Sequence, residues 1–174
     1  SKGMQIENEI YYHVHKKDYE PEKWEVGKIF EFNKDAFNYF FNFYSIENIK
    51  KTRTDIEDWK KIKEYSILIR ELVYEEVRYK CFSGLPSRRN CVWLCDKESL
   101  PLWEGKIGGD YDIYKVKATG SIHSCYAGAL DDTNINYKIL SEKAIAYWSG
   151  ECIGDINEKE YLFEGRIELL EKIK

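Results

Sequence analysis

The chain has 174 residues, a net charge of −4 and an aromatic content of 16%. This length is typical of one domain whose core needs no metal or disulfide, so we treat residues 1–174 as a single domain, with residues 1–3 before Met4 as a tag remnant. The aromatic content excludes disorder over most of the chain. The acidic balance argues against general binding to duplex nucleic acid.

Cysteine usage and hydropathy bear on the cellular compartment. The five cysteines show no regular spacing, which is typical of reduced thiols inside a cell. No apolar run approaches the ~20 residues of a membrane span, and no basic-then-apolar segment opens the chain. We therefore expect a cytoplasmic protein that makes no contact with a membrane.

The first half of the chain is predicted to form two short strands and two helices. The first strand covers residues 10–15. Residues 24–30 are predicted to form a turn followed by the second, short strand. Asn33 caps a predicted helix over residues 36–44, where aromatic side chains recur at helical spacing. Thr54 caps a longer predicted helix that runs to about Lys80. Its expected core-facing stripe consists of Ile56, Trp59, Ile62, Ile67, Leu68, Leu72, Val73 and Val77.

The second half is predicted to be richer in strands, and a loop over residues 82–89 leads into it. Asp96 caps a short predicted helix over residues 97–104, which Pro101 interrupts. The predicted order of elements, with strands first, then helices and then mostly strands, is typical of the α+β class. It lacks the regular alternation of a Rossmann fold. The remaining expected elements are strands over 91–95 and 111–118, a short strand or loop over 121–129, a helix over 137–148, a loop over 150–157, and strands over 160–163 and 166–170 hinged at Gly165.

The motifs do not indicate a metal site or a phosphate loop. Cys91 and Cys95 lie four apart on one predicted strand, and His13 and His15 lie two apart on another, but neither pair has the further ligands of a zinc site. We therefore expect no bound metal. The chain lacks Gly-x-Ser-x-Gly, Gly-x-x-x-x-Gly-Lys and Gly-x-Gly-x-x-Gly, which argues against hydrolase, P-loop and Rossmann chemistry. A Cys-His-Asn arrangement stays open, because all three residue types occur.

Glu158 and Glu160 form the most suggestive pair of acidic residues. They lie two apart where a strand is expected to begin, so their side chains are predicted to point the same way. Two such carboxylates facing a cleft would allow one to stabilise an oxocarbenium-like sugar carbon while the other polarises a nucleophile. The alternative is a solvated turn.

Together these segments resemble the ADP-ribosyltransferase superfamily, most closely a bacterial branch of its His-Tyr-Glu class. The first motif is Tyr-Tyr-His-Val-His at residues 11–15. The second is Val-Trp-Leu-Cys-Asp at residues 92–96, followed by Trp103. The third is Glu-Lys-Glu-Tyr-Leu-Phe-Glu-Gly at residues 158–165, preceded by Tyr-Trp-Ser-Gly at residues 147–150. The motifs occur in the order of the family and extend over nearly the whole chain.

The resemblance implies a fold and an activity. The fold would be two packed, mostly antiparallel sheets with helices around an NAD cleft. The activity would be cleavage of the nicotinamide–ribose bond of NAD, which is the substrate, with transfer of ADP-ribose to an acceptor. By the match of motifs, Glu160 would be the catalytic carboxylate and Glu158 would activate the acceptor. His13, or alternatively His15, would hold the adenine-side ribose.

The resemblance also assigns the walls of the cleft. Trp103 would stack on the nicotinamide ring, with Trp93 and Tyr12 as supporting walls. Trp93 stands where the family has Tyr, and Pro101 within the helix of the second motif is a further departure. These two departures bear on which ring stacks and on whether activity is retained.

The loop Gly-Leu-Pro-Ser-Arg-Arg would supply the pyrophosphate contacts through Ser87 and through Arg88 or Arg89. The acceptor would be a protein or a nucleic acid, and by analogy with the fold the protein would be a toxin, an antiphage effector or a housekeeping modifier, with an antitoxin or immunity protein as a possible partner. The alternatives are an inactive module that binds NAD, ADP-ribose or a protein, and an RNA 2′-phosphotransferase or NAD glycohydrolase on the same fold.

Overall fold

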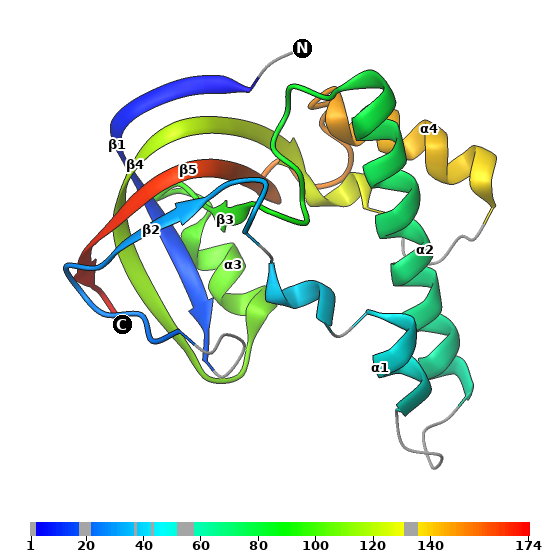
Figure 1. The fold of residues 1–174 in the computed structure, drawn as a ribbon, viewed down its shortest axis with the longest axis horizontal. Coiled ribbons are helices and arrows are strands. Elements are labelled where there is room, and N and C mark those ends of the chain that lie inside the picture. Colours follow the sequence, from blue (N-terminus) through cyan, green and yellow to red (C-terminus); the bar gives the residue numbers. More distant parts are fainter. Residues whose placement is uncertain (1–2, 18–21, 37, 43, 52–57, 131–135) are drawn as a thin grey trace.

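The computed structural model of the chain describes residues 3–17, 22–36, 38–42, 44–51, 58–130 and 136–174 (Figure 1). A curved sheet forms one part of the molecule, and the long helices gather at one end of it. The helices are α1 (Ile46–Lys51), α2 (Asp58–Cys81), α3 (Leu100–Ile107) and α4 (Tyr137–Trp148), with the 3-10 turns η1 (Tyr39–Asn42) and η2 (Ala127–Ala129). The strands are β1 (Met4–Lys16), β2 (Ile29–Phe32), β3 (Val92–Leu94), β4 (Tyr111–Tyr126) and β5 (Lys159–Lys172).

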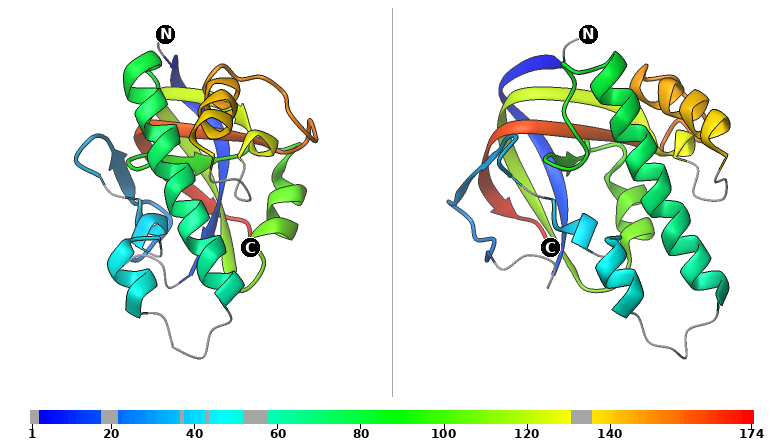
Figure 2. Two further views of the ribbon diagram at one scale, coloured as in Figure 1. Left: turned by 90° about the vertical axis from the view of Figure 1, so that its right-hand side faces the viewer. Right: turned by 45° about the vertical axis from the view of Figure 1, so that its right-hand side comes forward.

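The named strands pair antiparallel in one sheet with the order β1-β4-β5-β2. The short strand β3 pairs with β5 next to β2, so β3 and β2 follow each other along the same edge. A backbone bridge between Tyr12 and Cys95 brings β1 beside the end of β3, and the long strands curve strongly (Figure 2). The α+β class is confirmed. The expected two packed sheets are wrong for the described residues, because β4 and β5 run unbroken through a single curved sheet.

Two facing glycines explain why β4 and β5 are continuous where strand breaks were expected. Gly120 and Gly165 pair in the ladder, with φ angles of 155° and 142°. A Cβ atom on Gly165 would lie 2.5 Å from the carbonyl oxygen of Thr119 and 3.0 Å from the ring of Phe163. Without side chains, the two backbones bend together while Phe163 packs against them. The expected hinge at Gly165 is therefore a bend inside one strand.

Replacing Gly165 with alanine is expected to lower the free energy of unfolding by about 2–4 kcal/mol, because the new methyl group meets backbone atoms at a positive φ. Urea unfolding measures the change. Gly105→Ala in α3 is the matched control, since a Cβ atom there has no neighbour within 4 Å and alanine is the better helix former. Equal stability of the Gly165 variant and the wild type would contradict this account of the bend.

The helices differ from the sequence expectations in three places. The predicted helix over residues 36–44 is wrong in its described part, where only the 3-10 turn η1 forms. The Asn38 side-chain oxygen accepts a hydrogen bond from the Phe40 amide, and this local contact competes with helix formation. Helix α1 was not predicted. Helix α3 begins at Leu100, because Asp96 instead binds the amide and hydroxyl of Ser99, and Pro101 lies in the first turn, where its missing N–H costs nothing. The helix over residues 137–148 is confirmed as α4, and Thr54 lies outside the described residues.

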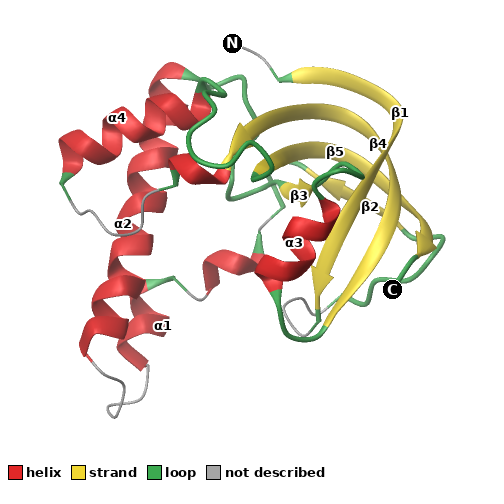
Figure 3. Cartoon of the chain, turned by 180° about the vertical axis from the view of Figure 1, so that it is seen from behind, coloured by secondary structure: helices red, strands yellow, loops and turns green. Residues whose placement is uncertain are grey.

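Only one part of α2 packs on the core. Trp59, Ile62 and Leu72 were expected to be buried, but their exposed fractions are 58%, 65% and 57%. Helix α2 contacts α4 along its second half, whereas its first half extends beyond the sheet beside α1, and α3 lies against β1 (Figure 3). Among the described residues, no helix is both long enough and apolar enough to span a membrane.

Candidate functional site

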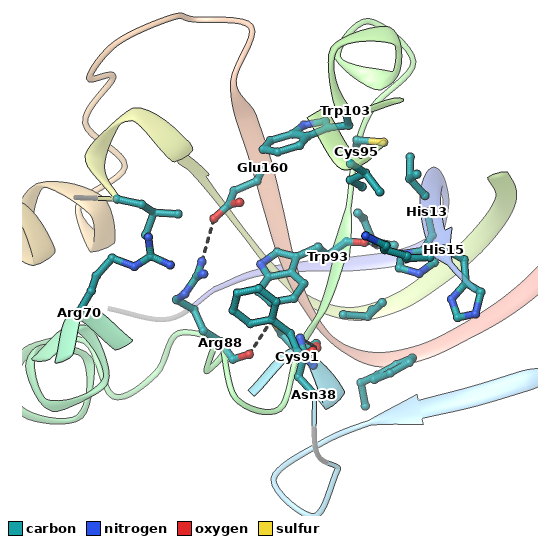
Figure 4. A pocket seen from close by; sticks show the side chains of 18 residues that line it. His13, His15, Asn38, Arg70, Arg88, Cys91, Trp93, Cys95, Trp103 and Glu160 are labelled. Atoms are coloured by element: carbon teal, nitrogen blue, oxygen red, sulfur yellow. Dashed lines mark hydrogen bonds and ion pairs between the residues drawn. The ribbon is translucent and has the colours of Figure 1, made fainter. Parts of the chain in front are cut away.

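A cavity of about 400 Å³ opens where several parts of the chain converge (Figure 4). Strand β1 contributes His13, β3 contributes Trp93, α3 contributes Trp103, α2 contributes Arg70, and the start of strand β5 contributes Glu160. The wall is mainly aromatic and aliphatic, with a few charged groups among the rings. Such a pocket suits a small molecule that has a flat ring and polar groups at defined points.

Glu160 is the acidic residue of this wall. Its exposed fraction is 7%. One carboxylate oxygen, Oε1, lies 3.0 Å from Nη1 of Arg88 and accepts a hydrogen bond from the Tyr147 hydroxyl at 2.5 Å. For the other oxygen, Oε2, the described residues supply no hydrogen-bond partner. The protein therefore orients the carboxylate through one oxygen, and the second is available to a ligand.

Arg88 donates hydrogen bonds to protein groups from Nε and from both terminal nitrogens. Its Nε and Nη2 donate to the two oxygens of Glu71 at 2.9 and 3.0 Å, and Nη1 donates to both Tyr147 and Glu160. Burial alone would lower the pKa of Arg88, but Glu71, Tyr147 and Glu160 hold it well above its ordinary value. Likewise, burial would raise the pKa of Glu71, yet Arg88 and Arg70 hold it below its ordinary value. These opposite charges stabilise one another in the interior.

His13 is neutral in the folded protein, because burial, followed by the neighbouring His15, lowers its pKa to about 3. Its Nδ1 lies 2.8 Å from the carbonyl oxygen of Trp93. Since a carbonyl oxygen only accepts, Nδ1 carries the proton and Nε2 is left as an acceptor. Trp24 stacks on both rings, with centroid distances of 4.6 Å to His13 and 4.4 Å to His15. The arrangement can accept a hydrogen bond from a hydroxyl group.

The buried histidines should make stability depend on pH. Burial also lowers the pKa of His15, to about 4. Between about pH 6.5 and pH 5 the unfolded chain takes up protons at these positions while the folded chain does not, so the free energy of unfolding should fall as the pH falls. The slope should reach up to about 1.4 kcal/mol per pH unit for each histidine. Urea unfolding at several pH values measures it.

The double variant His13→Asn, His15→Asn supplies the control for this prediction. It should show a shallower dependence over the same pH range, because His123 is then the remaining histidine. The lowered pKa values of Glu71 and Asp96 contribute mainly nearer about pH 4, outside the range compared. An unchanged slope in the double variant would contradict the assignment.

Two indole rings form much of the remaining wall. Trp103 is fixed by a hydrogen bond of 2.9 Å from its Nε1 to the carbonyl oxygen of Lys159, and Lys106 lies 5.8 Å from its ring centroid. The Cζ atom of Arg88 lies 5.2 Å from the centroid of the Trp93 ring, and the rings of Trp93 and Phe40 pack edge to face. Nε1 of Trp93 is buried without a hydrogen-bond partner. Trp103 is thus held by a hydrogen bond to the backbone, whereas Trp93 is held by its contacts with Arg88 and Phe40, which also line the cavity.

The structure brings His13, His15, Trp93, Trp103, Arg88 and Glu160 to one cavity but leaves three other predicted site residues outside it. Glu158 precedes β5, pairs with Lys106 at 2.9 Å and does not line the cavity, so its role beside Glu160 stays a prediction. Tyr12 packs beside Val14 and Cys95. Ser87 binds Glu75 through its hydroxyl.

The predicted pyrophosphate contact through Arg88 finds no support in this geometry, because its N–H groups are directed at Glu71, Tyr147 and Glu160. The sequence prediction missed Arg70 and Glu71, and did not assign Tyr147 a role. Helical spacing from Ile67 and Tyr74 already places residues 70 and 71 on the buried face of α2, so a charged pair on an apolar stripe was the available signal.

The cysteines of this region are buried thiols. Burial raises the pKa of Cys91 and Cys125 well above its ordinary value and raises that of Cys95 to about 12. A thiolate is therefore disfavoured at all three positions. Within the described part of the chain, no three His, Cys, Asp or Glu residues are grouped as metal ligands.

These observations define the class: an α+β protein with an arginine-held carboxylate in the wall of an aromatic cavity. Residues 11–174 match a protein family described as "Protein of unknown function (DUF2441)", and the chain belongs to that family. A search of curated proteins finds no match. The matched range includes every residue of the cavity wall named above.

Proposed function

We propose that the protein is an NAD-dependent ADP-ribosyltransferase that cleaves the nicotinamide–ribose bond of NAD in this cavity. The observation that carries the proposal is the convergence of Glu160, His13, Trp93 and Trp103 on one cavity wall. These residues come from three separate motifs that resemble ADP-ribosyltransferases, and a chance likeness gives no reason for them to share a site.

The nicotinamide ring would stack against Trp103. A pyridinium ring is flat and positively charged, and the face of an indole attracts such a cation. Because Nε1 of Trp103 is held by the Lys159 carbonyl group, the ring is already oriented before the substrate arrives. Little ordering of this side chain would then be needed on binding.

Glu160 would act on the nicotinamide ribose. Its free oxygen, Oε2, would accept a hydrogen bond from a ribose hydroxyl and stabilise the positive charge that develops on the anomeric carbon. As the carbon–nitrogen bond breaks, its electron pair stays on the nicotinamide nitrogen, which becomes neutral. The oxocarbenium ion then accepts an electron pair from the nucleophile, which loses its proton to water or to a nearby base. Arg88 and Tyr147 hold Oε1 and keep the carboxylate in one orientation.

His13 would bind the other ribose. Its Nε2 is an acceptor because Nδ1 donates to Trp93, so it suits a hydroxyl donor and does not add positive charge. The remaining length of NAD would therefore extend from Glu160 toward His13.

Incubation of the protein with NAD labelled in its adenosine part, together with cell lysate, tests the proposal. Free nicotinamide should appear, and the label should become attached to a protein or a nucleic acid. Nicotinamide with label only in free ADP-ribose would indicate a glycohydrolase. A rise in melting temperature without nicotinamide release would overturn the enzyme and favour a binding module, and neither effect would indicate an interaction protein.

A further inference from the structure

Arg70 is a buried arginine that the structure uses very little. Its exposed fraction is 8%, and it lines the cavity from helix α2. Its single hydrogen bond in the described residues runs from Nη2 to Oε1 of Glu71 at 2.9 Å, and its Nε is buried without a partner. A guanidinium has five N–H donors, so four remain unused.

This arrangement differs from that of the neighbouring Arg88, which donates from Nε, Nη1 and Nη2 to Glu71, Tyr147 and Glu160. Burying a charged group with unused donors is costly unless a partner satisfies them. Arginine is the side chain that best matches oxyanions through several parallel N–H bonds. The geometry of Arg70 is therefore that of an anion-binding group.

The position of Arg70 indicates which substrate the anion belongs to. In Figure 4, Arg70 lies on one side of Glu160 and Arg88, whereas His13, His15 and Trp103 lie on the other. Helix α2 and strand β1, which carry Arg70 and His13, lie well apart in the ribbon, with β1 in the sheet and α2 on the side of the long helices (Figure 1). If NAD extends from Glu160 toward His13, as in the proposed function, its own phosphates lie away from Arg70.

We infer that Arg70 binds a phosphate group on the acceptor of ADP-ribose, an inference that rests on the proposed function. A phosphate monoester has three terminal oxygens and a charge of about −1.5 to −2 at neutral pH. It can therefore accept from more than one edge of the guanidinium. A carboxylate has two coplanar oxygens and one charge, and Glu71 already provides such a group to Arg70. Phosphate thus satisfies the unused donors more completely.

Thermal unfolding of the full chain with inorganic phosphate, compared with chloride at the same ionic strength, tests the inference. At about five times the dissociation constant, phosphate should raise the melting temperature by about 2–4 °C. Arg70→Gln should lose this rise, and Arg70→Lys, which keeps the charge in case the first variant folds poorly, should retain only part of it. Arg166→Gln is the matched control, because Arg166 is exposed on β5, does not line the cavity and should keep the full rise.

Four further outcomes decide the details. Acetate that stabilises as well as phosphate would overturn the preference for phosphate. In Glu160→Gln saturated with NAD, phosphate should still raise the melting temperature; loss of that rise would show that NAD occupies Arg70 and would overturn the assignment to the acceptor. Absence of the rise in the wild type would overturn the inference alone, whereas an Arg70-dependent rise without nicotinamide release would overturn the proposed function and, with it, the acceptor assignment.

Discussion

Replacing Glu160 with glutamine is expected to lower the rate of nicotinamide release from NAD by about 10²- to 10³-fold. Glutamine keeps the size of the side chain but removes the negative charge that would stabilise the oxocarbenium ion. The effect should fall on kcat rather than on the concentration of NAD that half-saturates the protein, because the charge on the sugar carbon develops only as the bond breaks. Quantifying free nicotinamide by chromatography gives both parameters.

Glu168→Gln is the matched control for this substitution. Glu168 lies on the same strand but pairs with Lys117 at the surface, 3.4 Å away, so its loss should change the rate by no more than about twofold. NAD should still raise the melting temperature of Glu160→Gln, which separates lost chemistry from lost binding. Equal rates in Glu160→Gln and the wild type would remove Glu160 from the proposed mechanism.

Replacing Arg88 with methionine is expected to lower the free energy of unfolding by about 3–5 kcal/mol. The guanidinium forms ion pairs with two buried carboxylates, Glu71 and Glu160. Without it, the negative charges of both carboxylates would lose a buried positive partner. Methionine preserves much of the volume, so the loss reflects charge and hydrogen bonding rather than a cavity. Urea unfolding at neutral pH measures the loss.

Arg89→Met is the control for this second prediction, since Arg89 is exposed next to Arg88 and its replacement should change stability by less than about 0.5 kcal/mol. The deficit of Arg88→Met should also shrink in acid, because Arg88 helps to lower the pKa of Glu71, and protonation of Glu71 removes the buried charge that the variant leaves unpaired. A loss of similar size in both variants, or a deficit that is the same in acid, would contradict the role assigned to the network.

The sequence was informative where the signal is local. Helix α4 was predicted with its bounds from the helical spacing of its apolar positions, and the structure adds that Asn136 caps it with two hydrogen bonds. The apolar segments around His13, Trp93 and Glu160 were predicted as strands for the same reason. Their meeting at one cavity was foreseen only through the resemblance, since strand patterns alone do not show which strands become neighbours.

What could not be predicted depends on contacts between distant segments. A glycine within a strand pattern usually indicates a break or a bulge. Here Gly120 and Gly165 pair across β4 and β5, and because they face each other the two strands bend together without breaking. The carboxylate network joins α2, the loop at Arg88, α4 and β5, so its members are separated by up to 90 positions (Arg70 to Glu160) and no local spacing connects them. For Glu158, alternation could not show that the strand begins one residue later or that Lys106, on α3, forms an ion pair with this carboxylate.

The most direct test of the central claim is a crystal structure of Glu160→Gln with NAD. The account predicts the nicotinamide ring against Trp103, a ribose hydroxyl within hydrogen-bond distance of residue 160, and a hydroxyl of the second ribose bonded to Nε2 of His13. NAD bound elsewhere on the molecule, or a cavity that excludes NAD while the protein remains folded, would contradict it.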